Sequence, residues 1–103
     1  MFLKIAPDGA VTLEDRDNFR AFKLVVACAK GELGELRRAL TGTAELPDQS
    51  TAWIFEAALR RWPGVAQDAA WQQGLSAMIE KARPHGWIDD ARQAIKAHVE
   101  WAG

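Results

Sequence analysis

This chain contains five tryptophans and no tyrosine, and every tryptophan lies after residue 50. An indole ring buries a large rigid apolar surface and carries one N–H group that needs a partner once it is buried. Such rings dominate the packing wherever they occur. We therefore expect the second half of the chain to hold much of the core, or a surface that contacts another protein. The five residues are Trp53, Trp62, Trp71, Trp87 and Trp101.

The length and composition predict one domain, residues 1–103, with a single hydrophobic core. Hydrophobic residues make up 49% of the chain and charged residues 26%, which argues against a disordered protein. The net charge of −1 supplies no broad positive field, so we expect no nucleic-acid partner. No apolar run is long enough to cross a bilayer.

Cysteine usage and the first residues bear on the location of the protein. Cys28 is the single cysteine, which excludes an intramolecular disulfide, and it lies in the apolar run 24–29. A buried, structural thiol in a reducing compartment fits this placement. The first residues lack the long apolar segment of a signal peptide. We therefore expect a cytoplasmic protein with no membrane contact.

The N-terminal segment predicts a β-hairpin arm over residues 1–13. Two short apolar stretches, 2–5 and 10–13, flank a Pro-Asp-Gly turn at 7–9. Proline presets φ, aspartate can bond the backbone ahead of it, and glycine tolerates positive φ. Because an isolated hairpin is marginally stable, this arm must dock on the rest of the fold or pair with another chain.

Apolar residues spaced three and four apart predict helices along the remaining chain. Glycine, proline and capping residues, with Ser50 or Thr51 capping the third, place helices at about 15–30, 32–40, 51–62, 66–82 and 88–101. The run 22–28 also fits a buried strand, and its periodicity does not separate the two. The expected fold class is mainly α: a small bundle of four to five helices over residues 15–103, preceded by the short hairpin.

The sequence contains no motif for metal binding, phosphate binding or nucleophilic catalysis. Its two histidines, His85 and His98, are not spaced as ligands on one helix, and no paired cysteines occur. The glycines at 31 and 34 have neither a preceding strand nor a following P-loop lysine. We therefore expect no metal, no cofactor and no catalytic residue, although an enzyme is not excluded.

Four side chains are candidate interface or ligand contacts: Trp62, Trp87, His98 and Trp101. The three tryptophans fall near the ends of the expected helices, where rings can meet a partner. His98 shares a helical stripe with two of them, whereas Glu100 would point to the far side of that helix. Arg92, on the same expected helix, could contact an anionic ligand.

Two functions from different classes follow from these observations. The first is a non-enzymatic interaction or oligomerisation module, either a homodimer or an accessory subunit that binds another protein. Tryptophan density, the wide apolar arc of residues 88–101 and the open edges of the hairpin favour it. The alternative is a domain that binds a small-molecule ligand, or an enzyme, with a pocket around His98, Trp87 and Trp101 between helices.

Overall fold

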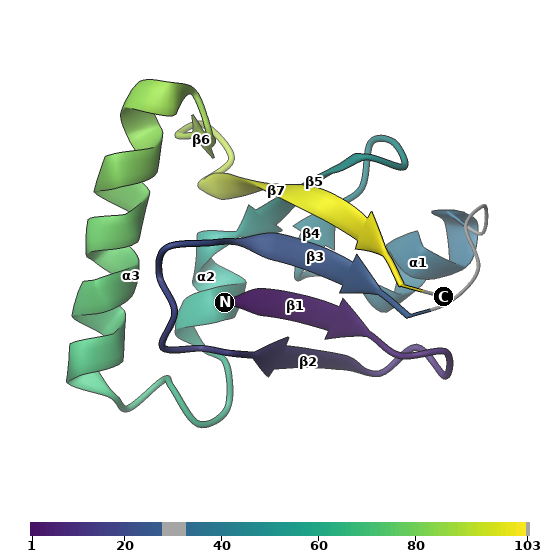
Figure 1. Ribbon diagram of the computed structural model, residues 1–103, viewed down its shortest axis with the longest axis horizontal. Helices are drawn as coiled ribbons and strands as arrows, with labels where there is room; N and C mark the ends of the chain where they lie inside the picture. Colours follow the sequence, from purple (N-terminus) through teal and green to yellow (C-terminus); the bar gives the residue numbers. More distant parts are fainter. Residues whose placement is uncertain (28–32, 103) are drawn as a thin grey trace.

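The computed structural model describes residues 1–27 and 33–102, and its fold is mixed α/β (Figure 1). Seven strands form one curved sheet, and the described residues contain three α-helices and one 3-10 turn. The prediction of a mainly α helical bundle over residues 15–103 is therefore wrong. Strands occupy most of one segment that was expected to be a helix, 88–101, and parts of two others, 15–30 and 51–62.

The strands lie in the order β2-β1-β3-β7-β5-β4, and β6 also pairs with β7. The pairs β1–β3 and β3–β7 are parallel, whereas the other pairs are antiparallel. The long last strand therefore lies in the middle of the sheet. The bounds are Phe2–Ile5 (β1), Val11–Glu14 (β2), Lys23–Val26 (β3), Ala44–Glu45 (β4), Thr51–Phe55 (β5), Ile88–Asp89 (β6) and Ala94–Trp101 (β7).

The N-terminal hairpin is confirmed, since β1 and β2 pair antiparallel around the expected turn. The side chain of Asp8 accepts a hydrogen bond from the amide of Ala10 at 2.9 Å, and Gly9 has a φ of +90°. The other edge of β1 pairs with β3. The hairpin is therefore part of the sheet and not a separate arm.

The α-helices are α1 (Leu33–Ala39), α2 (Glu56–Arg60) and α3 (Ala69–Ala82), and α3 continues into the 3-10 turn η1 (Arg83–His85). Helices were expected near the positions of α1 and α3. Asp68 is the N-cap of α3, and its carboxylate accepts the amide N–H of Trp71 at 3.1 Å. In Figure 1, α3 stands at one end of the strands and α1 lies near the other end.

The helix expected over residues 15–30 is not present in the described part of that range. Residues 15–22 form turns and extended backbone, and Lys23–Val26 form β3, as the alternative of a buried strand predicted. The branched residues Val25 and Val26 fit a strand that has sheet neighbours on both sides. The prediction of a buried Cys28 falls outside the described residues.

The helix expected over residues 51–62 begins as strand β5 and is helical only over α2. Neither Ser50 nor Thr51 caps a helix. Their amides donate instead to the carboxylate of Asp48, at 2.8 and 2.9 Å, in a turn that precedes β5. The antiparallel pairing of β5 with β7 is a long-range contact that residue spacing does not reveal, and such tertiary context overrides a local helical pattern.

The helix expected over residues 88–101 is also wrong, since β6 and β7 occupy this segment. Burial alternates along β7, with period two: Ile95, Ala97 and Val99 are buried, and Lys96, His98 and Glu100 are exposed. This alternation is the pattern of a strand with one face on the core. The apolar arc that was expected on a terminal helix is instead the inner face of a central strand.

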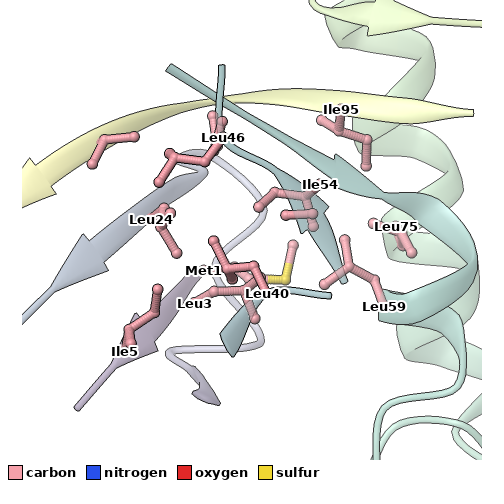
Figure 2. Packing of buried hydrophobic residues seen from close by; sticks show 14 of the residues in the cluster. Met1, Leu3, Ile5, Leu24, Leu40, Leu46, Ile54, Leu59, Leu75 and Ile95 are labelled. Carbon is pink, nitrogen blue, oxygen red and sulfur yellow. The ribbon is translucent and has the colours of Figure 1, made fainter. Parts of the chain in front are cut away.

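The core lies between the inner face of the sheet and the three helices. Figure 2 shows side chains from the sheet strands converging with Leu59 of α2 and Leu75 of α3. Both halves of the chain contribute, and aliphatic residues make up most of the cluster. Among the tryptophans, Trp71 is buried in the core, with 2% of its surface exposed.

Candidate functional site

A pocket of about 640 Å³ lies beside the C-terminal end of α3. One wall consists of α3, η1 and Trp87, a second of the loop at residues 19–22, and a third of the first residues of β5 and the middle of β7. Its size falls within the range of about 300–1,000 Å³ that is common for small-molecule sites.

The turn after α3 places two aromatic rings at the rim of the pocket. Pro84 lacks the N–H that a continuing helix would need, and Gly86 adopts a left-handed conformation with a φ of +78°. The chain therefore reverses, and Trp87 stacks on His85 with ring centroids 4.4 Å apart and planes inclined by 19°. The carbonyl of Trp87 accepts the amide N–H of Lys96 at 2.7 Å, which joins this turn to β7.

Phe19 anchors the second wall on α3. Its ring lies against Gly74, where a β-carbon would come within 2.4 Å of the ring, and its centroid is 5.9 Å from that of Trp71. The indole Nε1 of Trp71 donates to the carbonyl of Arg16 at 2.8 Å. A glycine in the middle of α3 thus lets the loop pack closely on the helix.

The loop is held at further points by backbone hydrogen bonds. The amino group of Met1 donates to the carbonyls of Asn18 and Ala21, at 2.6 and 3.0 Å. The guanidinium of Arg16 donates to the carbonyl of Gly64 at 3.1 Å. Because these contacts order the loop before any ligand arrives, binding would cost little further conformational entropy.

The third wall comes from β5 and β7, mostly from their outer face, with Ile95 of the inner face also in the lining. Thr51 of β5 and His98 of β7 are paired in register, and Lys96 lies on the same face of β7 as His98. Glu100 shares this face, so the expectation that it points away from His98 is wrong. The pKa of Glu100 is lowered by its hydrogen bond and ion pair with Lys23, at 2.6 Å, with a smaller effect from His98.

Cationic side chains from three elements surround the pocket: Arg20 from the loop, Lys81 from α3 and Lys96 from β7. Its lining contains no aspartate or glutamate. Apolar and aromatic side chains form the rest of the surface, chiefly Phe19, Phe22, Met78 and Ile95. The pocket thus combines an apolar lining with positive charge.

Two of the four candidate residues, Trp87 and His98, line this pocket. Trp101 does not: it lies beside a second, more open hollow of about 630 Å³, and its Nε1 donates to the carbonyl of Gln49 at 2.8 Å. His98 borders both hollows. Trp62 is half-buried and packs against the core.

Arg92, the expected anion contact, is not part of the pocket. Its guanidinium pairs with Asp89 at 2.7 Å and with Glu45, and it lies 5.3 Å from the ring centroid of Trp53. The hydrogen bonds from Arg92 lower the pKa of Asp89. Its charge is therefore already matched by two carboxylates.

Sequence reasoning missed the cations of the pocket and its aromatic loop. Period-two alternation in residues 94–101 was the one signal that would have placed Lys96 and His98 together. No local pattern brings Phe19 or Arg20 to the end of α3, because the contact of the loop with Gly74 spans more than fifty residues of sequence.

A serine, an aspartate and a histidine lie near one another beside the second hollow, but their contacts do not form a catalytic triad. The hydroxyl of Ser50 donates to Asp48 at 2.9 Å, so its proton is directed to the carboxylate and not to His98. The amide and hydroxyl of Ser50 and the amide of Thr51 together lower the pKa of Asp48. A triad needs the histidine between the other two.

Over residues 1–27 and 33–102, no three histidine, cysteine, aspartate or glutamate side chains are placed to hold a metal ion. No helix in the same residues combines the length and apolar character needed to cross a bilayer. Comparisons with protein-family models, curated proteins and solved structures find no match to this chain. The fold and the site define a small mixed α/β domain with a pocket at the C-terminal end of α3.

Proposed function

We propose that this protein is a small-molecule-binding domain, and that its ligand occupies the pocket between α3, η1 and strands β5 and β7. The observation that carries the proposal is the pocket itself: aromatic and aliphatic walls, with polar groups that converge from separate elements. The expected pocket of His98, Trp87 and Trp101 is thereby revised, since Trp101 lies outside it.

Binding, and not catalysis, is the activity that the side chains favour. The hydroxyl of Ser50 is directed to Asp48, and the described lining contains no carboxylate to orient either histidine. A binding role needs only a shaped apolar surface with a few fixed polar contacts. We keep the cytoplasm as the proposed location, because a chain with one cysteine forms no internal disulfide.

A fragment library tests the proposal by ¹H–¹⁵N NMR, with the indole N–H signals of the tryptophans as reporters. Binders should shift the signal of Trp87 and leave that of Trp62 unchanged. Ala21 is exposed and lines the pocket, so Ala21→Trp should fill the space and abolish these shifts. Ala70→Trp, at an exposed position of α3 away from the pocket, is the matched control. The proposed site would be refuted if the compounds still shift the Trp87 signal in the Ala21→Trp variant.

Association with a second copy or another protein is a second candidate function. Trp87 is 46% exposed, and β2 ends the order of described strands with one unpaired edge. Most of the apolar residues of 88–101, which favoured this function in the sequence, lie on the inner face of β7 and are not available to a partner. Light scattering across a concentration series tests it: a mass of about 11.4 kDa throughout would exclude a homodimer, whereas a doubled mass that Trp87→Ser abolishes would support one.

A further inference from the structure

The charges of the pocket contrast with those of the whole chain. The chain has thirteen basic and fourteen acidic residues, a net charge of −1. The pocket lining has three basic residues, Arg20, Lys81 and Lys96, and no acidic one. Because they come from a loop, a helix and a strand, the fold and not a run of sequence brings these charges together.

No carboxylate of the described residues lies within salt-bridge distance of the three pocket cations, and they differ from the other unpaired cations, such as Lys4, because they line one cavity. Salt bridges occupy Lys23, Arg60, Arg83 and Arg92 in that part of the chain, but none of the three pocket residues. Lys96 has a small lowering effect on the pKa of Asp48, but Oδ1 of Asp48 already accepts from Ser50 and Thr51. The positive charge of the pocket is thus left for a ligand.

The apolar part of the lining indicates the rest of the ligand. Phe19 and Phe22 face the pocket from the loop, and Trp87 borders it from the turn after α3. Aromatic side chains favour flat ring systems, which gain from offset or edge-to-face contacts as well as from burial. Thr51 and His98 add groups that can hydrogen-bond.

We propose that the pocket selects small aromatic carboxylates, with the ring against Phe19, Phe22 and Trp87 and the carboxylate contacted by Lys81 and Lys96. This inference rests on the proposed function and adds the chemical class of the ligand. Charge-assisted hydrogen bonds to a carboxylate are stronger than neutral ones, so the charge of the ligand should matter more than its exact shape.

A matched series tests this selectivity by calorimetry and by the NMR signals described above: 2-naphthoate, 2-naphthamide and 2-naphthylmethylammonium. They share one ring system and differ in charge. We expect the carboxylate to bind at least about tenfold more tightly than the amide and the ammonium to bind most weakly. Added salt should weaken the binding of the carboxylate. 2-Naphthyl phosphate tests whether a phosphate monoester replaces the carboxylate, and tighter binding of that compound would overturn the assignment to carboxylates.

Variants of the two lysines test whether they contact the carboxylate of the ligand. Lys81→Met and Lys96→Met keep most of each aliphatic side chain and remove its charge, and each should weaken naphthoate binding several-fold or more while leaving the amide unchanged. Lys4→Met, at an exposed position of β1 away from the pocket, is the matched control and should leave both unchanged. Circular dichroism checks that each variant is folded.

The outcomes separate the two proposals. If the amide binds as tightly as the carboxylate, and both shift Trp87, selection of anions is wrong although the pocket binds ligands. If naphthoate binds but the lysine variants behave like Lys4→Met, the carboxylate is contacted elsewhere and the proposed pose is wrong. If neither the naphthyl compounds nor the fragment library shifts Trp87, the proposed function itself is wrong.

Discussion

Replacing Gly74 with alanine tests the contact that fixes the aromatic loop on α3. The new β-carbon would lie 2.4 Å from Cε2 and 2.7 Å from Cζ of Phe19. Carbon atoms in contact are about 3.5–4.0 Å apart, so the ring must move by about 1 Å or more. Overpacking of this kind costs about 1–3 kcal/mol. Alanine in place of a glycine inside a helix raises the free energy of unfolding by about 1 kcal/mol through its higher helix propensity.

The net prediction is that Gly74→Ala lowers the free energy of unfolding by about 0–2 kcal/mol. Gly34→Ala in α1 is the matched control, because no described atom lies within 4 Å of its β-carbon position. Gly34 lies in the first turn of α1, so Gly34→Ala gains part of the same helix propensity and causes no clash. The two variants should therefore differ by about 1–3 kcal/mol, measured by urea unfolding followed by far-ultraviolet circular dichroism.

A second variant shows whether Phe19 is the cause. In a Phe19→Ala background the ring is absent, so Gly74→Ala should become neutral or stabilising, and the double-mutant cycle should give a clear coupling energy. The reasoning is refuted if Gly74→Ala stabilises the protein as much as Gly34→Ala does. It is also refuted if the cost of Gly74→Ala is the same with and without the Phe19 ring.

Three further predictions concern stability, each measured by urea unfolding. Trp71→Phe keeps a buried ring but removes the donor to the Arg16 carbonyl, and should cost about 1–3 kcal/mol; an unchanged midpoint would contradict that role. Leu75→Ala removes a fully buried side chain and should cost about 2–5 kcal/mol; a cost below 1 kcal/mol would contradict its place in the core. Asp48→Asn should destabilise the protein at pH 7. Because hydrogen bonds lower the pKa of Asp48 in the folded state, its stabilising effect is present above its usual value of 3.8 and lost as pH falls through the lowered value. The difference from the natural protein should therefore narrow below pH 3.8, and a difference independent of pH would exclude this linkage.

The sequence correctly predicted the elements that depend on contacts between residues close together in the chain. The Pro-Asp-Gly turn and the strands beside it follow from residues 2–13, and α3 follows from a long amphipathic stretch that ends at Pro84. β7 was mistaken for a helix because alanines, tryptophans and His98 recur at three- and four-residue spacing as well as alternating. Pairing with β3 and β5, which no local pattern reveals, decides between the two.

The residues of the candidate site likewise fall into those that the sequence could indicate and those that it could not. Trp87 and His98 could be singled out by residue type, and both border the pocket. Their partners could not, because Arg20, Lys81 and Lys96 come from segments far apart in the sequence. Only the order of strands and the packing of the loop on Gly74 bring them to one place. Charge alone gives no such indication, since each of these residues resembles an ordinary surface cation.

The position of β7 affects how the chain can fold during synthesis. This strand follows every other described strand in the sequence, yet it lies between β3 and β5. While the ribosome still holds residues 94–101, β1–β3 and β4–β5 are two separate pieces, and β3 and β5 each have an open edge. Open edges can pair with other nascent chains. The arrival of β7 closes both edges at once, so assembly of the whole sheet waits for the last strand to emerge.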